Sequence, residues 1–214
     1  MNIEQARFNM IEQQIRPWEV LDPNVLDLLF VVKREDFAPA AYRNLAFADM
    51  ELPIGQGQVM LAPRVEARLM QELGLKKTDK VLEIGTGWGA MAEYAARHYG
   101  CRVTTTTLSQ EQYVWATERI ARAGLQDRVE VLLCDYRDLT GQYDKLVSIE
   151  MIEAVGQRYL PTFFRTCQAR LRPGGRMAIQ AITIQDQRYR DYSKSVDFIQ
   201  RYIFPAAFCP ASRQ

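Results

Sequence analysis

The sequence predicts an α/β fold, a doubly wound and mainly parallel sheet preceded by a helical N-terminal annex. After Lys80, short apolar runs alternate with helix-forming segments, as in parallel strands joined by helical crossovers. At the first strand-to-helix junction, "EIGTGWG" places three glycines in five positions. Such a turn lets a ligand lie against bare backbone, so both observations favour an α/β domain with a binding loop.

The composition is that of an ordinary soluble globular chain. Of 214 residues, 48% are hydrophobic and 25% are charged, and the formal net charge is +1. No global field is available to hold nucleic acid, so we expect no nucleic-acid partner. We also expect no transmembrane segment, because no apolar run reaches the roughly 18 residues that a spanning helix needs.

The N-terminus lacks the basic and apolar regions of a secretory signal. Four cysteines are scattered and there is one histidine, so we expect no metal site. Reduced thiols without a signal fit a cytoplasmic protein.

The annex, residues 1–78, is expected to be helical. Ile3, Phe8, Ile11 and Ile15 recur at helical spacing over 3–16, and Pro17 ends the run. A second helix is expected within 21–32, where Asp22 is the N-cap and Pro23 the first helical residue. Residues 33–58 read as loop, and a third helix over 62–75 ends at Gly74.

The α/β domain, residues 79–214, is expected to contain five strands and four helices. The strands are predicted at 80–84, 102–107, 129–134, 144–149 and 176–182. The helices are predicted at 88–98, 109–123, 157–171 and 190–202.

The glycine loop, residues 85–89, is the first candidate site. In a parallel sheet, ligands bind beyond the carboxyl ends of the strands, and an exposed helix N-terminus attracts a negative group. The spacing of Gly85, Gly87 and Gly89 is G-x-G-x-G, which differs from the dinucleotide fingerprint. A smaller ligand with a carboxylate suits this loop, although a tight turn without a ligand has the same pattern.

Two further strand ends carry candidate ligand contacts. Thr107, Ser109 and Gln112 follow the second strand, where a ribose is usually bound, and offer hydrogen bonds in place of the usual acid. After the third strand, Asp135 can accept from an adenine amino group and Tyr136 can cover a base. The alternative is that Asp135 caps a helix or turn.

Four stretches in order, "VLEIGTGWG", "TTTTLSQEQ", "LLCDYRDL" and "VSIEMIEAVG", resemble the cyclopropane fatty acid synthase family of S-adenosylmethionine-dependent methyltransferases. This resemblance runs from about residue 80 to 205. Residues 5–87, with "MIEQQIRPWEVLDPNVLDLL" and "ELPIGQGQ", resemble the protein-L-isoaspartate O-methyltransferase family. The chain therefore reads as a chimera of two methyltransferases joined at their common glycine loop.

The resemblance implies a class I (Rossmann-like) methyltransferase fold with S-adenosylmethionine as cofactor and S-adenosylhomocysteine as product. It implies that Glu83 steers the ammonium group of the cofactor and that the three glycines carry its methionine end. Trp88 either shelters the cofactor or packs on the sheet. The residues named above at the next two strand ends would then face the ribose and the adenine.

The resemblance also implies a catalytic carboxylate, Glu153 in "MIEAVG", near a bound bicarbonate. Ala154 and Gln180 replace the histidines that many synthases place there. In the other family a hydroxyl residue precedes the Ala-Pro pair, and this chain has Leu61 in that place. Both acceptor sites therefore depart from their family patterns.

Three functions remain open at this point. The first is methylation of a lipid or other small acceptor, the second is carboxyl methylation of isoaspartyl protein, and the third is cofactor binding with little catalysis. The family fold also ends with two more strands, which we expect to be missing. The strand near 178–182 would then be an open edge, which we expect a second copy of the chain to cover.

Overall fold

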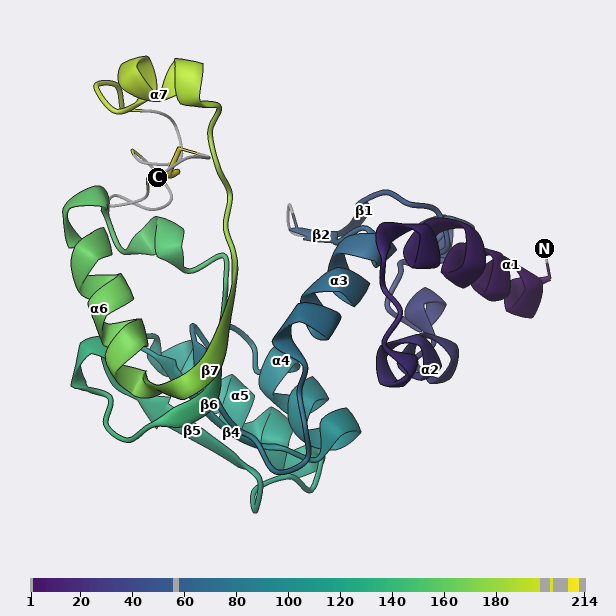
Figure 1. Ribbon diagram of the computed structural model, residues 1–214, viewed down its shortest axis with the longest axis horizontal. Coiled ribbons are helices and arrows are strands. Elements are labelled where there is room, and N and C mark those ends of the chain that lie inside the picture. The colour runs from purple at the N-terminus through teal and green to yellow at the C-terminus, as the bar shows by residue number, and fades with distance from the viewer. Residues whose placement is uncertain (1, 56–57, 197–200, 202–207, 212–214) are drawn as a thin grey trace. The chain divides into compact units, whose positions relative to one another are not determined.

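The computed structural model describes residues 2–55, 58–196, 201 and 208–211. The chain forms two compact units, Met1–Gly74 and Leu75–Gln214. Each unit is described by itself below (Figure 1).

The first unit is helical. Its elements are α1 (Ile3–Met10), a π-helical turn (Ile11–Ile15), a 3-10 turn (Arg16–Trp18), α2 (Pro23–Val31) and α3 (Pro63–Leu73). Asp22 caps α2 by accepting a hydrogen bond from the Asn24 amide at 2.9 Å. Gly74 ends α3 with φ 55°. Both predicted helix boundaries are confirmed.

The buried face of the first helix differs from the predicted one. Ile11 and Ile15 are fully buried, whereas Ile3 and Phe8 are exposed. Arg7 occupies the buried stripe instead, because its guanidinium bonds to the buried carboxylate of Glu35 and lies over the Phe47 ring. A paired arginine can enter a core that an apolar pattern does not assign to it.

Residues 33–58 were predicted to be a loop, and this prediction is only partly right. They contain two 3-10 turns, Arg34–Asp36 and Ala40–Leu45, and the strand β1 (Leu52–Gly55). β1 pairs antiparallel with β2 (Gln58–Met60). The buried Arg34 side chain organises the segment by donating to the carbonyl groups of Ala46 and Leu61 and to the Glu66 carboxylate.

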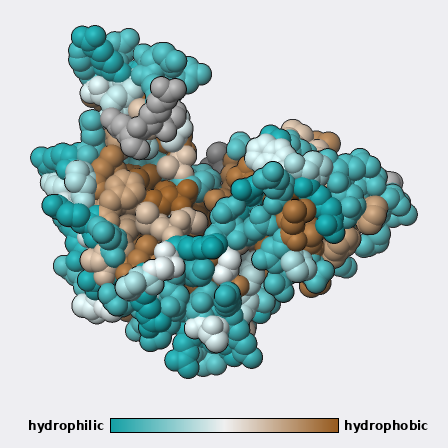
Figure 2. Space-filling view, in the orientation of Figure 1, coloured by the Kyte–Doolittle hydropathy of each residue, from teal (hydrophilic) through white to brown (hydrophobic). Residues whose placement is uncertain are grey.

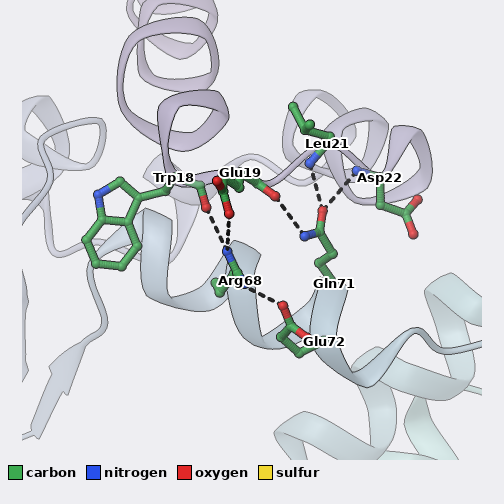
Figure 3. A network of polar contacts seen from close by, with 7 residues as sticks. All are labelled: Trp18, Glu19, Leu21, Asp22, Arg68, Gln71 and Glu72. Carbon is green, nitrogen blue, oxygen red and sulfur yellow. Dashed lines mark hydrogen bonds and ion pairs between the residues drawn. The ribbon is translucent and has the colours of Figure 1, made fainter.

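A glutamine on α3 holds the turn that precedes α2 (Figure 3). Gln71 Oε1 accepts from the amides of Leu21 (2.7 Å) and Asp22 (2.9 Å), and its Nε2 donates to the Glu19 carbonyl (2.9 Å). One turn away, Arg68 donates to the Trp18 carbonyl at 3.0 Å. Glu19 has φ 59°, a conformation that non-glycine residues rarely adopt, and this network secures it.

The second unit is built on a parallel five-stranded sheet in the order β5-β4-β3-β6-β7. The strands are β3 (Lys80–Ile84), β4 (Arg102–Thr107), β5 (Val129–Leu133), β6 (Tyr143–Ile149) and β7 (Leu171–Gln180). The helices are α4 (Ala90–Tyr94, continued by a π-helical turn to Tyr99), α5 (Gln110–Arg122), α6 (Leu160–Arg170) and α7 (Asp186–Tyr192).

The predicted doubly wound sheet is confirmed. Right-handed crossovers put α4 and α5 on one face of the sheet and α6 on the other, as Figure 1 shows. β3 is the central strand, and four of its five residues are buried. The strand order reverses there, because the chain leaves β3 for β4 on one side while β6 lies on the other. The crevice beyond the carboxyl ends of β3 and β6 is therefore the expected ligand site.

Two predicted elements near the C-terminus have boundaries that differ from those of the structure. β7 starts five residues earlier than predicted and ends two residues earlier. A helix was predicted over 190–202, whereas α7 begins at Asp186 and has ended by Ser193; Arg201 is again helical, and residues 197–200 and 202–207 lie outside the described residues. The hydroxyls of Ser193 and Ser195 donate to the carbonyls of Arg190 and Tyr192, bonds that compete with helical ones.

Candidate functional site

The glycine loop after β3 has three glycines with positive φ, each in a different setting. A Cβ at Gly85 (φ 99°) would stand 2.8 Å from Met151 Cγ, so this glycine lets the segment after β6 approach. A Cβ at Gly89 would stand 3.1 Å from Ala116 Cβ in α5. A Cβ at Gly87 (φ 50°) would meet no atom within 4 Å. The open space that a ligand can use therefore lies at Gly87.

The loop is held to the neighbouring strand by its backbone. The amides of Gly85 and Thr86 both donate to the Thr106 carbonyl, at 3.1 and 2.9 Å. The Gly89 amide donates to the Thr86 carbonyl at 2.9 Å, which closes the turn before α4. The loop is thus shaped without help from a ligand.

Glu83 lies beneath the loop and is 3% exposed. Thr105 Oγ1 donates to Glu83 Oε2 at 2.6 Å, and Thr105 in turn pairs with Thr86 Oγ1 at 2.7 Å. Burial raises the pKa of Glu83 to about 8, and the hydrogen bond from Thr105 only partly offsets this. The carboxyl therefore carries its proton at neutral pH, and a nearby cation would favour its ionised form.

The residues predicted to face a ribose form a helix cap. Ser109 is the N-cap of α5 and accepts from the Gln112 amide at 3.2 Å. Thr107 Oγ1 donates to Gln112 Oε1 at 2.7 Å and accepts from the Ser109 amide at 3.1 Å. The structure brings the three side chains together at the carboxyl end of β4, the place expected for a ribose. Ser109 is committed to the helix, and the Gln112 amide nitrogen is the group left to donate.

Asp135 and Tyr136 follow β5 as predicted, and both have partners within the chain. Asp135 accepts from Arg137 Nε at 2.9 Å and from its second nitrogen at 2.6 Å, and caps the 3-10 turn Tyr136–Asp138. These bonds hold the pKa of Asp135 below its ordinary value. The Tyr136 ring packs edge-on against Phe163 of α6, with centroids 5.5 Å apart. The capping alternative thus holds for Asp135, whose remaining lone pairs can still accept a hydrogen bond.

Trp88 projects from the glycine loop and is 47% exposed. Its ring meets the edge of Trp115 on α5, with centroids 6.1 Å apart. The ring therefore packs against α5, and its two predicted roles, sheltering the cofactor or packing on the sheet, stay predictions.

Glu153 lies in a 3-10 turn, Ile152–Ala154, that follows β6. Its Oε1 accepts from the Ile182 amide, just beyond β7, and its Oε2 is buried with no hydrogen-bond partner among the described residues. Beside it, Gln180 Nε2 donates to Glu150 Oε1 at 2.9 Å, and Gln180 Oε1 is also buried without a partner there. The turn therefore offers hydrogen-bond acceptors.

These groups fit a bound bicarbonate poorly. The Ile182 amide donates to Glu153, and one N–H of the Gln180 amide donates to Glu150. The described contacts leave the second N–H of Gln180 to donate, beside two buried acceptors, Glu153 Oε2 and Gln180 Oε1, whereas such an anion needs several donors.

Sequence reasoning missed three contributors to the site. Thr105 was hidden in a run of four threonines, although a fully buried polar residue in a central strand is a signal of a specific partner. Met151 and the strained Glu150, with φ 48°, left no sequence signal. The strain at Glu150 lies where the chain leaves β6 for the turn that carries Glu153, and backbone strain is common near functional sites.

Other kinds of site receive no support from the part of the chain that the structure describes. It contains no group of three or more His, Cys, Asp or Glu side chains arranged to hold a metal ion. None of its helices is long and apolar enough to cross a membrane. Two surface cavities, of about 350 and 200 Å³, lie away from the glycine loop.

Comparison with known proteins identifies relatives over most of the chain. Residues 40–214 match the family model of mycolic acid cyclopropane synthetase. A tuberculostearic acid methyltransferase of Mycobacterium tuberculosis is 47% identical over 146 residues, which are 68% of this chain and 34% of that protein. A sphingolipid C9-methyltransferase of Gibberella zeae is 36% identical over 66% of this chain and 28% of that protein. The chain thus spans about a third of the length of these relatives.

Solved structures support the same fold. The mycolic acid cyclopropane synthase CmaA1 complexed with SAH and CTAB matches 69% of this chain and 56% of its own, with a TM-score of 0.60 and 25% identity. The cyclopropane synthase MmaA2 from Mycobacterium tuberculosis matches all of this chain and 71% of its own, with a TM-score of 0.63. At 20% identity the second likeness shows the fold alone. The predicted class I methyltransferase fold is confirmed.

The comparisons do not support a chimera. The matched family model begins at residue 40, well before the glycine loop, and crosses that loop without interruption. A protein-L-isoaspartate O-methyltransferase structure matches 83% of this chain and 54% of its own with a TM-score of 0.55, but at 22% identity. That likeness shows the fold alone, so it does not support an origin of the N-terminal part from the isoaspartate methyltransferase family.

Proposed function

Because the chain belongs to the mycolic acid cyclopropane synthetase family, we propose that it transfers a methyl group to the carbon chain of a lipid. The cofactor is S-adenosylmethionine. The relatives named above are, by their names, a tuberculostearic acid methyltransferase and a sphingolipid C9-methyltransferase. We extend their chemistry to this chain as a class of acceptor.

The observation that supports a lipid acceptor is an apolar rim at the carboxyl edge of the sheet. A large exposed apolar residue stands at or just beyond the end of every strand of the five: Trp88 after β3, Leu108 after β4, Leu133 in β5, Ile149 in β6 and Ile182 after β7. In Figure 2, hydrophobic residues gather on one face of this unit, over the region that α6 and β7 occupy. Apolar surface at a ligand-binding edge fits an acyl chain, whereas a peptide substrate calls for polar partners.

The cofactor residues fit S-adenosylmethionine in charge and space. Gly87 leaves open room for the methionine end, and the buried Glu83 carboxyl would ionise beside its ammonium group. Gln112 with Thr107 would face the ribose, and Asp135 with Tyr136 the adenine. Trp88 would then cover the cofactor from the exposed side of the loop.

The bound cofactor supplies an electrophilic methyl group on a sulfonium, a leaving group that needs no nucleophilic side chain. The chain's own task is to position the acceptor and to exclude water, which the apolar rim serves. A carbon–carbon double bond of the acceptor uses its π electron pair to bond the methyl group. Positive charge then develops on the acyl chain of the lipid, and a proton must leave. Glu153 Oε2, a buried acceptor without a partner among the described residues, would take that proton.

Product analysis with a methyl-labelled cofactor tests the proposal. The purified chain is incubated with labelled S-adenosylmethionine and vesicles of unsaturated phospholipid, and a parallel reaction contains an isoaspartyl peptide. We expect label in the lipid extract that resists mild base. Label released as methanol from the peptide would mean carboxyl methylation, and cofactor binding without either product would mean a binding protein.

A further inference from the structure

One face of α6 carries two arginines and two threonines at helical spacing. Thr162, Arg165, Thr166 and Arg170 are separated by three, one and four residues, so their side chains share one face of the helix. Together with Arg137, which follows β5, they line a surface cavity of about 200 Å³. We call these five residues the arginine cavity. None of them belongs to the glycine loop or to the turn that carries Glu153.

The positive charge of the arginine cavity is only partly compensated. Arg137 is engaged by Asp135, as described above. Among the residues that the structure describes, Arg165 donates only to Thr162 Oγ1, at 3.2 Å, and the buried Arg170 Nε has no hydrogen-bond partner. Within residues 2–55 and 58–196, no carboxylate pairs with Arg165 or Arg170. The helix dipole favours a cation at the C-terminal end of α6, where Arg170 lies, but the dipole does not provide the hydrogen bond that a buried N–H group needs.

The arginine cavity presents hydrogen-bond donors, so its ligand should carry hydrogen-bond acceptors. A guanidinium has five N–H donors and no acceptor, and the Thr162 hydroxyl, already accepting from Arg165, has its own proton to donate. Phosphate oxygens match this arrangement, since arginine binds them through two parallel hydrogen bonds. A volume of 200 Å³ holds several times the roughly 30 Å³ that one water occupies, which is enough for a phosphate group.

We propose that the arginine cavity binds the phosphate group of an anionic ligand. The phosphate belongs either to a phospholipid head group or to a soluble phosphate ester. Binding of this group is separate from methyl transfer and does not require the proposed function to be correct.

Two binding measurements test the proposal and separate the two sources. In the first, glycerol 3-phosphate is titrated into the full chain and followed by calorimetry. In the second, the chain is floated with phosphatidylcholine vesicles that contain or lack phosphatidylglycerol. We expect binding to at least one phosphate probe, with affinity that falls as salt is raised, because surface charges are screened.

Matched variants assign the binding to the cavity. Because Arg165 is exposed, Arg165→Gln should leave the fold unchanged. We expect this variant to bind the phosphate probe about tenfold more weakly, because a charged hydrogen bond is lost. Arg165→Lys, which keeps the charge but not the paired donors, should bind with intermediate affinity. Arg122→Gln removes the same charge from the exposed side of α5 and should bind like the unchanged chain.

The outcomes divide clearly. Binding to glycerol 3-phosphate without flotation identifies a soluble ester, and flotation that needs phosphatidylglycerol identifies a head group. The proposal is overturned if neither probe binds, if Arg165→Gln binds as tightly as the unchanged chain, or if Arg122→Gln loses as much affinity as Arg165→Gln.

Discussion

At the scale of single residues, Glu83 links proton binding to stability. Its pKa is about 8 in the folded chain and about 4.5 when unfolded, so the folded state holds the extra proton between these values. The free energy of unfolding therefore falls as pH rises from about 4.5 to 8, by roughly 5 kcal/mol in total for this group. Above pH 8 its contribution is constant.

Replacing Glu83 by Gln should remove this dependence. We expect E83Q to be more stable than the unchanged chain at pH 8 by several kcal/mol, with little difference near pH 4.5. Denaturant unfolding of both chains at a series of pH values measures the difference between their unfolding free energies. Other titrating groups, such as Glu66, are common to both chains, so their contributions cancel in this difference. Parallel stability curves for the two chains would show that Glu83 is not the titrating group.

The same carboxyl should make cofactor binding depend on pH. If the cofactor ammonium lies beside Glu83, binding favours the ionised carboxylate and releases a proton below pH 8. The affinity for S-adenosylhomocysteine should then rise by up to tenfold per pH unit between pH 6 and 8 and level off above it. Calorimetry at pH 7 in buffers of different ionisation enthalpy counts the released proton. A binding heat that is the same in all buffers would place the ammonium elsewhere.

Glu153 gives the sharpest test of catalysis by one residue. Glu153→Gln keeps an oxygen to accept from the Ile182 amide but loses the ability to take a proton. We expect label transfer to fall by about 10²- to 10⁴-fold, while S-adenosylhomocysteine raises the melting temperature as before. A variant that transfers label at the unchanged rate would exclude Glu153 as the base.

At the scale of elements, the glycine loop separates a structural glycine from a binding one. Gly85→Ala sets a Cβ 2.8 Å from Met151 Cγ at φ 99°, and we expect a loss of about 2–3 kcal/mol in unfolding free energy. Gly87→Ala meets open space at φ 50° and should cost about 1 kcal/mol.

Ligand binding should be affected more by Gly87→Ala than by Gly85→Ala, the reverse of their order in stability. For the unchanged chain, S-adenosylhomocysteine at a hundredfold excess over its dissociation constant adds about 2.7 kcal/mol. Gly87→Ala should lose most of this gain although it folds, because its methyl group occupies the ligand's space. Thermal unfolding with and without ligand compares the two variants, and an undiminished shift in Gly87→Ala would move the site away from Gly87.

The sequence predicted elements best where the pattern of side chains alone decides them. The buried strand Lys80–Ile84, the cap at Asp22 and the stop at Gly74 all depend on residues close in sequence. The buried Arg7 depends on Glu35, a partner 28 residues along the chain, so local periodicity missed it. The hairpin of β1 and β2 is local, but Pro53 and Gly55 made its segment read as loop. At the site, sequence placed Asp135 and Glu153 correctly after their strands. It could not decide whether Asp135 contacts adenine or caps a turn, since the pairing of its carboxylate with Arg137, two residues away, depends on side-chain conformations that the sequence does not specify.

At the scale of the whole molecule, we expect family membership to separate this chain from isoaspartyl repair. Leu61 has no hydroxyl to hold a substrate carboxylate, and its carbonyl is engaged by Arg34. We expect isoaspartyl peptide methylation to be absent when lipid methylation is measured side by side. Turnover of the peptide at a rate usual for enzymes would show that this expectation is wrong.

The sheet edge gives a second prediction at this scale. Among the described residues, β7 is paired along β6 only, so its other side carries unpaired backbone groups. Association of two copies through this edge remains a prediction. Light scattering over a range of concentrations should show a dimer, and Met177→Pro, at a backbone position that alternates away from β6, should shift the equilibrium toward monomer. A monomer at every concentration would rule the association out.

The bonds made by Gln71 set the order in which the first unit can form. Its three partners, Glu19, Leu21 and Asp22, lie 49 to 52 residues earlier in the chain. Closing so long a loop costs entropy that neither segment recovers alone. During synthesis the turn before α2 must therefore wait, with its strained Glu19 unsecured, until residue 71 has left the ribosome and α3 has folded. A ribosome stalled before that point should present a nascent chain whose first helices are still open to protease.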